Sequence, residues 1–160
     1  MAVIGNGNVA MDISRVLFKD PSLMAPYDIP TSVLKVLQKS QVRTIQLIGR
    51  RGAVQSAFTI KEIREISRVE GISIYALKEE FEASVNDQSL REMNPDFSVH
   101  ARGIQRKFEF LKSSCHFLDS DEHLNDVLSK ASTKDKRLVL RYLKNPIELL
   151  GTDRIEAVKL

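Results

Sequence analysis

The stretch "GNGNVAMDISRVL", from Gly5 to Leu17, contains the pattern G-x-G-x-x-A, in which two glycines flank one residue and an alanine follows three positions later. The apolar segment Ala2–Ile4 before it is typical of the end of a β-strand, and the apolar spacing from Asn8 to Phe18 is typical of a helix. A strand, a glycine-rich turn and a helix in this order indicate the start of a dinucleotide-binding unit.

Each small residue of the turn has a role in such a unit. Gly5 permits a tight exit from the strand, Gly7 lets the backbone approach a pyrophosphate, and Ala10 allows the helix and the strand to pack closely. The backbone amides of Asn8 and Val9 would then face phosphate oxygens, helped by the helix dipole. A plain tight turn before a helix would carry the same residues, so the turn alone leaves both interpretations open.

The second predicted strand lies in "VRTIQLIGRRG", from Val42 to Gly52, and ends in two arginines. NAD-binding folds hold the ribose 2′-hydroxyl with an acidic residue at this place. Arg50 and Arg51 stand there instead, and guanidinium groups suit the 2′-phosphate of NADP. Two solvated arginines after a strand are the alternative, but together with the glycine turn the pair favours NADP. We therefore expect both arginines to share a pocket with the turn.

The segment between the two motifs is longer than usual, since about forty residues separate them where about 20 is common. Asp20–Pro30 has three prolines and is predicted to be a loop. Thr31 is expected to cap a short helix, so that loop and helix form an insertion in the crossover. The apolar residues expected to face the core are Val9, Ile13, Val16 and Leu17 in the first helix and Val33, Val36 and Leu37 in the short one.

The rest of the chain completes an α/β pattern. A helix is predicted over Ala57–Val69, a strand over Ile72–Tyr75, a basic helix over Ala101–Ser114 and a further helix over Asp121–Ala131, while the polar stretch Glu79–Asn94 has no clear assignment. Two alternating segments, Arg137–Leu143 and Arg154–Leu160, are expected to pair as an antiparallel hairpin. The predicted fold is therefore a Rossmann-like α/β domain over residues 1–160, with a parallel core sheet, inserted helices and a C-terminal antiparallel hairpin.

Both ends of the chain look truncated. Only Met1–Ile4 precede Gly5, which is short for a strand, and the alternating last segment stops abruptly. We therefore expect the chain to be part of a longer protein.

Composition narrows the class of protein. The chain has 160 residues, enough for one domain with a core. It has 24 Lys and Arg against 21 Asp and Glu, and this excess of positive charge is too small to indicate nucleic-acid binding. No apolar run approaches the ~18 residues that a membrane span needs. Cys115 is the only cysteine, which excludes an internal disulfide. The histidines lack metal-ligand spacing, so no metal site is expected; they are His100, His116 and His123.

Two stretches together resemble a known family. "VIGNGNVAMDISRVL", from Val3 to Leu17, and "IGRRGAVQSAFTIKEIRE", from Ile48 to Glu65, closely resemble the NADP-binding domain of the adrenodoxin reductase family, the mitochondrial-type ferredoxin–NADP reductases with their bacterial relatives. The likeness is good from Val3 to about Phe81 and weaker beyond. A glutamate-synthase-type reductase is a rival within flavoproteins, although the "GRRG…FTIKE" run argues against it. A basic module that binds an acidic protein or nucleic acid is the rival from a different class.

The resemblance implies a flavoenzyme in which NADPH gives a hydride to FAD and single electrons pass to an acidic [2Fe–2S] ferredoxin or adrenodoxin. It implies a mitochondrial location and no nucleic-acid partner. Because the flavin performs the redox chemistry and only one glycine-rich turn is present, this chain alone is not expected to bind FAD, and no catalytic residue is assigned.

The resemblance also implies the roles of particular residues. Gly5, Gly7, Asn8 and Val9 match the pyrophosphate turn, Arg50 and Arg51 match the 2′-phosphate pair, and Glu62 matches a glutamate near the nucleotide. The candidates for docking the ferredoxin are Arg102, Arg106 and Lys107. The spacing of Thr59 and Glu62 also fits a capping box, which is compatible with a place near the nucleotide, and the three basic residues also fit a solvated helix face.

Overall fold

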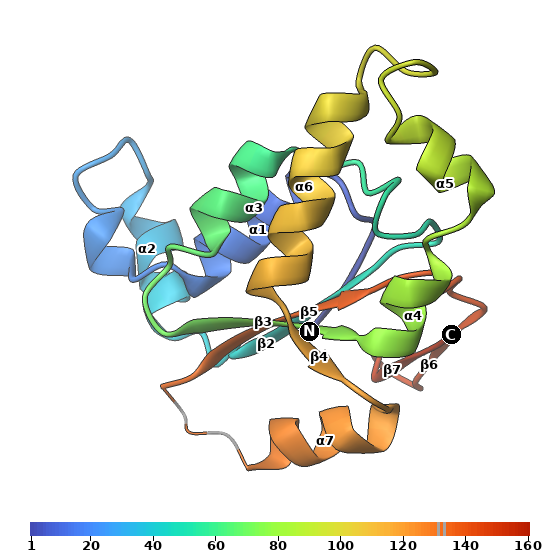
Figure 1. The fold of residues 1–160 in the computed structure, drawn as a ribbon. Helices are drawn as coiled ribbons and strands as arrows, with labels where there is room; N and C mark the ends of the chain where they lie inside the picture. Colours follow the sequence, from blue (N-terminus) through green and yellow to red (C-terminus); the bar gives the residue numbers. More distant parts are fainter. Residues whose placement is uncertain (131, 133) are drawn as a thin grey trace.

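The computed structural model describes residues 1–130, 132 and 134–160, and its core is a five-stranded sheet (Figure 1). The strands are β1 (Ala2–Ile4), β2 (Thr44–Ile48), β3 (Ile72–Leu77), β4 (His116–Leu118) and β5 (Lys136–Arg141). They lie in the order β1-β2-β5-β3-β4, and every neighbouring pair is parallel. The predicted α/β domain with a parallel core is confirmed.

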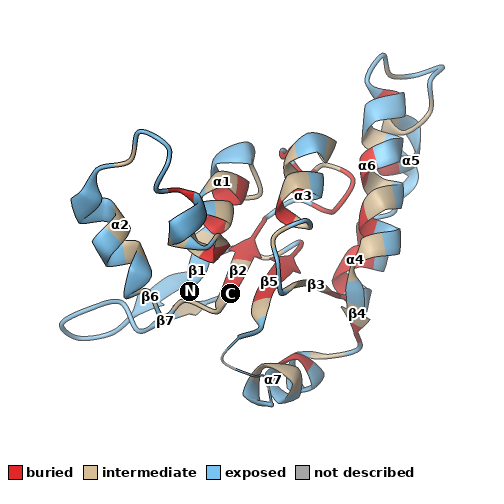
Figure 2. Cartoon of the chain, turned by 90° about the vertical axis from the view of Figure 1, so that its left-hand side faces the viewer, coloured by how far each residue is buried: buried red, intermediate tan, exposed pale blue. Residues whose placement is uncertain are grey.

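Helices cover the two faces of the sheet unequally. Figure 2 shows α1 (Asn8–Phe18), α3 (Ile60–Ile66) and α6 (Ala101–Ser114) over one face, whereas α7 (Asp121–Ser129) lies on the other. The largest buried cluster forms beneath the three helices; its members include Met11, Phe18, Ile45, Leu47, Ile63, Ile66, Leu111, Leu138 and Leu140. Burial of these apolar side chains is the main force that holds the layers together.

The predicted pairing of Arg137–Leu143 in a hairpin is wrong, because this segment contains the central strand β5. Strand β5 pairs in parallel with β2 on one side and β3 on the other, and its residues from Arg137 to Arg141 are buried. The antiparallel hairpin is present, but it joins β6 (Glu148–Leu150) to β7 (Ala157–Lys159). The sequence pattern of this segment predicts a strand with one face exposed to solvent, whereas Arg137 and Arg141 are both buried.

The first helix is rotated relative to its predicted orientation. Val9 is 72% exposed, and Ile13 and Val16 are also exposed, while Leu17 is partly buried against the core. Ala10 and Ser14 face inward instead, and Ser14 is accommodated there because its hydroxyl donates a 2.8 Å hydrogen bond to the Ala10 carbonyl. The inward side of α1 thus combines these small residues with the large apolar residues that it adds to the core.

The insertion holds a short 3₁₀ helix, η1 (Pro21–Leu23), and α2 (Thr31–Gln38). Pro30, rather than Thr31, occupies the N-cap position of α2, and Val33 and Val36 are exposed, so the predicted cap and inward face are wrong there. Helix α2 has no fully buried residue and contributes little to the core.

Three further segments differ from expectation. The stretch Glu79–Asn94 holds most of α4 (Lys78–Ala83) and all of α5 (Asp87–Glu92), and β4 was not expected because it is only three residues long. The helix predicted to reach Ala131 is described to Ser129, and Ala131 itself lies outside the described residues. None of the helices described is long and apolar enough to cross a membrane.

Candidate functional site

Direct pairing of β1 with β2 brings the glycine turn and the two arginines together. Ile4 stands opposite Ile48, and the Gly5 amide donates a 2.8 Å hydrogen bond to the Ile48 carbonyl. Because the strands are parallel, the segments after both of them meet at the carboxyl edge of the sheet. A pocket of about 150 Å³ lies there; it is lined by Gly5, Asn6, Gly7, Gly49, Arg50, Arg51, Gln55, Ser56 and Ala57.

The turn itself leaves room for a ligand. Gly5 has a φ of +121°, a conformation that only glycine adopts readily, and no described atom lies within 4 Å of where a Cβ on Gly5 or Gly7 would stand. Gly7 is the N-cap of α1, with no side-chain cap, and the first turn of α1 holds no acidic residue. The amides at this helix start are therefore open to an anion.

Asn6 is a pocket residue that the sequence interpretation passed over. Its carbonyl accepts hydrogen bonds from the Ala57 and Phe58 amides, at 2.9 and 3.0 Å, which ties the turn to the loop before α3. Its side-chain Nδ2 and Oδ1 are buried without a hydrogen-bond partner in the described part of the chain. A buried amide with both a free donor and a free acceptor fits a polar ligand in the pocket. The signal in the sequence was an asparagine enclosed by two glycines.

Asn8 has two separate roles in the structure. Its side-chain Oδ1 accepts a 2.9 Å hydrogen bond from the Thr59 amide, so the side chain joins the start of α1 to the start of α3. Its backbone amide stays at the helix terminus, as does that of the exposed Val9.

Glu62 lies in the first turn of α3, outside the set of residues that line the pocket. Thr59 Oγ1 accepts a hydrogen bond from the Glu62 amide at 3.4 Å. The capping box is incomplete, because the Thr59 amide donates its hydrogen bond to Asn8 instead of to Glu62. The Glu62 carboxylate faces Arg15 at 3.6 Å, and its Oε2 is buried without a hydrogen bond among the described residues. The Glu62 carboxylate is therefore turned toward Arg15 and does not return the capping hydrogen bond.

The three docking candidates separate into two groups on α6. Arg102 and Arg106 are exposed, as a docking surface requires. Lys107 is buried: its Nζ donates to the Ser56 carbonyl and lies 5.5 Å from the centre of the Phe58 ring. Burial, and then the charge of Arg51, lower the pKa of Lys107 to about 8, against a smaller opposing effect of Glu92. Lys107 therefore does not belong to the exposed face on which it was predicted.

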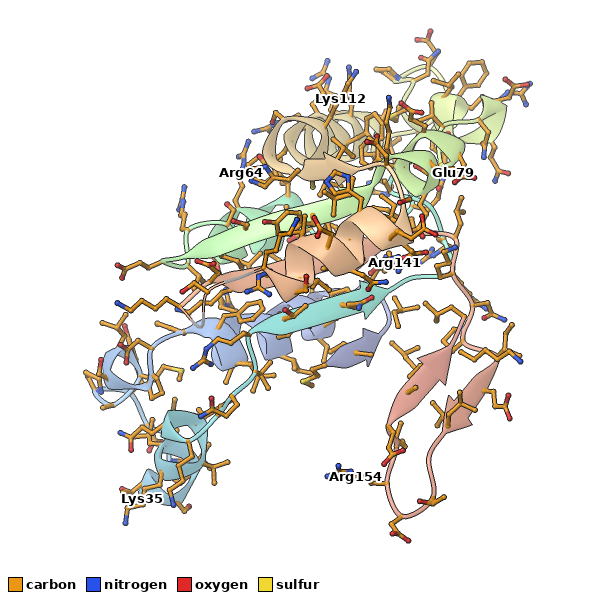
Figure 3. The ribbon with its side chains drawn as sticks, turned by 90° about the horizontal axis from the view of Figure 1, so that it is seen from below. Lys35, Arg64, Glu79, Lys112, Arg141 and Arg154 are labelled. Carbon is orange, nitrogen blue, oxygen red and sulfur yellow. The ribbon has the colours of Figure 1, made fainter. Side chains whose placement is uncertain are left out.

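A second polar cluster lies at the same edge of the sheet, where β5 ends beside the start of α7 (Figure 3). Arg141 and Glu80 form a buried ion pair at 2.7 Å, and Asp121 and Lys144 add contacts at 2.8 and 3.4 Å. Glu80 also accepts from the Tyr142 amide at 2.9 Å. Its carboxylate is thus satisfied from several sides, which is the pattern of a structural ion pair.

Cys115 and the histidines offer no second centre. Burial raises the pKa of the Cys115 thiol to about 12, so the reactive thiolate is scarce at neutral pH. Within the described residues, no group of three or more His, Cys, Asp and Glu side chains could hold a metal ion.

In the parallel sheet, the first strand runs through a glycine turn into a helix, and a polar pocket lies at the carboxyl edge. This arrangement defines a dinucleotide-binding domain of the Rossmann type. No protein-family model matches the chain. By sequence and by structure, the chain is similar to members of the adrenodoxin reductase family.

Known proteins are similar over nearly the whole chain. The probable mitochondrial NADPH:adrenodoxin oxidoreductase of Dictyostelium discoideum is 32% identical over 152 residues, which cover 94% of this chain and 26% of that protein. The NADPH-ferredoxin reductase FprA of Mycobacterium leprae is 28% identical over 158 residues, or 99% of this chain and 30% of that protein. A solved structure of Mycobacterium tuberculosis FprA in complex with NADPH matches with a TM-score of 0.73 at 27% identity, covering 98% of this chain and 30% of that one. The chain thus spans about 30% of the length of the curated relatives.

Proposed function

We propose that residues 1–160 are the NADP(H)-binding domain of a longer two-domain flavoprotein reductase. The observation that carries this proposal is the shared pocket of the glycine turn with Arg50 and Arg51. Strand β2 ends without the carboxylate that would hold a ribose 2′-hydroxyl, and two guanidiniums take its place. The NADPH bound to the solved FprA structure supports the same ligand for this chain.

The roles proposed for the individual residues are those that the resemblance implies, and the pocket supports the role of the two arginines. The amides of Asn8 and Val9 would hold the pyrophosphate at the start of α1, and Arg50 and Arg51 would hold the 2′-phosphate. Neither arginine forms an ion pair with a carboxylate within the described part of the chain, so both guanidiniums are free to bind an external anion. Glu62 would lie beside the nucleotide, with its charge balanced by Arg15.

The whole protein would be an NADPH:ferredoxin or adrenodoxin oxidoreductase. When bound, NADPH supplies the hydride and FAD, held elsewhere in the parent protein, receives it. The names of the relatives support a ferredoxin as the electron acceptor, and its acidic [2Fe–2S] type is part of the proposal. A mitochondrial location is supported by the relatives from Dictyostelium discoideum and Arabidopsis thaliana, whereas FprA is bacterial. Arg102 and Arg106 remain the proposed docking residues.

The test is selective stabilisation by the phosphorylated coenzyme. Thermal unfolding and titration calorimetry of the chain with NADP⁺ and NAD⁺ should show a rise in Tm and measurable binding for NADP⁺, with little effect of NAD⁺. Arg50→Ala/Arg51→Ala should lower the NADP⁺ affinity by about tenfold or more, because charge-assisted hydrogen bonds are worth roughly 1.5–3 kcal/mol each.

The matched control is Lys35→Ala/Lys39→Ala, which removes the same charge from exposed positions at α2 and should leave the preference intact. Equal Tm shifts with the two coenzymes in the unmodified chain would contradict the NADP assignment. Binding of RNA or of an acidic protein with no response to the 2′-phosphate would favour the basic-module alternative.

A further inference from the structure

Lys107 combines deep burial with a position beside the nucleotide pocket. It lies on α6, far along the chain from the glycine turn, and is 7% exposed. Its ammonium group donates to the carbonyl of Ser56, which itself lines the pocket, and lies over the Phe58 ring. The side chain therefore reaches from the outer helix layer to the back of the pocket wall.

The charge of Lys107 has no carboxylate partner close by. No described Asp or Glu lies within ion-pairing distance of its Nζ, and the charged groups that act on it are Arg51 and, from α5, Glu92. Burying an unpaired charge is costly, and a neighbouring cation raises the cost. Two arginines thus line the pocket and the ammonium of Lys107 lies behind its wall at Ser56, and within the described residues none of the three forms an ion pair with an acid.

We propose that Lys107 is a third cation of the 2′-phosphate site. Its hydrogen bond to Ser56 holds the loop of the pocket in place, and its buried positive charge selects NADP(H) over NAD(H). This inference rests on the proposed function and deepens it, since it assigns coenzyme preference partly to a residue on α6. Lys107 acts through the position of Arg51 and of the loop from Ala53 to Phe58, and through its charge, and is a positioning residue.

The role makes coenzyme preference depend on pH. The pKa of Lys107, lowered to about 8, means that the ammonium loses its proton as the pH rises through 8. A phosphate ester stays dianionic above its second pKa of about 6, and arginine keeps its charge throughout. The affinity for NADP⁺ should therefore fall between pH 7 and pH 9, while the affinity for NAD⁺ stays level.

The experiment is calorimetric titration of the chain with NADP⁺ and NAD⁺ at several pH values from 7 to 9. Lys107→Met keeps the length and apolar stem without the charge, and should bind NADP⁺ about tenfold more weakly, with unchanged NAD⁺ binding and a flat pH profile. Lys107→Arg keeps a charge that does not titrate, so it should retain most of the preference and also lose the pH dependence. Lys112→Met is the control on the same helix, since Lys112 is exposed (Figure 3).

The outcomes separate this role from the proposed function. An equal loss of affinity for both coenzymes in Lys107→Met would assign Lys107 a structural role and overturn the inference, and so would an unaltered preference. If Lys107→Met does not fold, the pH profiles of the unmodified chain and of Lys107→Arg decide: identical profiles overturn the inference. A failure of the unmodified chain to prefer NADP⁺ overturns the proposed function, and the role of Lys107 with it.

Discussion

Each of the two glycines that flank Arg50 and Arg51 is required by a neighbour far away in the sequence. A Cβ on Gly49 would stand 1.9 Å from Nδ2 of Asn6, and one on Gly52 would stand 2.3 Å from the Cβ of Ser84 and 3.0 Å from its Cα. The arginines are therefore held between two points at which the backbone passes very close to other parts of the chain. This close packing fixes the direction in which the loop leaves β2.

Gly52→Ala should destabilise the chain by about 1–3 kcal/mol, because the new methyl group meets backbone that cannot move without shifting α4. Urea unfolding followed by circular dichroism measures the change. Gly103→Ala is the matched control: it lies on α6 with no described atom within 4 Å of the added Cβ, and should gain about 0.5–1 kcal/mol. Equal stability of Gly52→Ala and the unmodified chain would show that the loop is not packed as described.

At this scale the sequence predicted the residues of the turn but not all of their partners. Gly5 and Gly7 follow a pattern of local spacing, Arg50 and Arg51 follow the end of a predicted strand, and all four line one pocket. The packing of Gly52 on Ser84 and the burial of Lys107 depend on contacts between distant segments, which no local pattern contains.

Strand β5 is the element that holds the sheet together, and it contains charged residues that are buried. Arg141 pairs with Glu80 in α4 and with Asp121 at the start of α7, so one side chain on β5 links two helices. Burial opposes the charge of Arg141, but the hydrogen bonds and charges of Glu80 and Asp121 outweigh it and raise its pKa.

Glu80→Gln should destabilise the chain by about 3 kcal/mol, because it leaves the buried Arg141 without its main counter-charge. Guanidinium unfolding monitored by circular dichroism would give the difference. Glu79→Gln changes the exposed neighbour and is expected to stay within about 0.5 kcal/mol of the unmodified chain. Similar values for the two variants would mean that the ion pair adds nothing to stability.

The alternating pattern of this segment explains the error in its predicted pairing. Arg137 and Arg141 are four positions apart and so resemble the solvent-exposed side of an edge hairpin, and the sequence does not show that Glu80 lies opposite Arg141. The helix over Ile60–Ile66 was predicted correctly in kind, because its isoleucines have regular helical spacing and Thr59 caps it.

The molecule as a whole consists of a well-packed sheet and peripheral parts that contact it little. Strand β5 is bonded on both sides and buried, whereas the β6–β7 hairpin stands apart from the five-stranded sheet and is almost wholly exposed (Figure 1). Strand order depends on these long-range pairings, so the sequence predicted the α/β class but not the place of β5 between β2 and β3.

Hydrogen exchange should reveal this division. Amides of β5 are expected to exchange slowest, near the rate set by global unfolding, and those of Glu148–Leu150 and Ala157–Lys159 among the fastest in regular structure. Mass spectrometry of peptides after timed exchange in D₂O measures both. Comparable protection of the hairpin and β5 would require a packing partner for the hairpin that the described residues do not provide.

The hydrogen-bonded ladder between β1 and β2 has a consequence for the evolution and engineering of this domain. The ladder sets the distance between the glycine turn and the two arginines. That distance does not depend on the length of the connection from α1 to β2, which contains η1 and α2. The entropy lost in closing a loop grows only slowly with its length. The connection between α1 and β2 can therefore vary in length among natural sequences without moving the coenzyme pocket. A reporter or a second domain can be inserted there for the same reason.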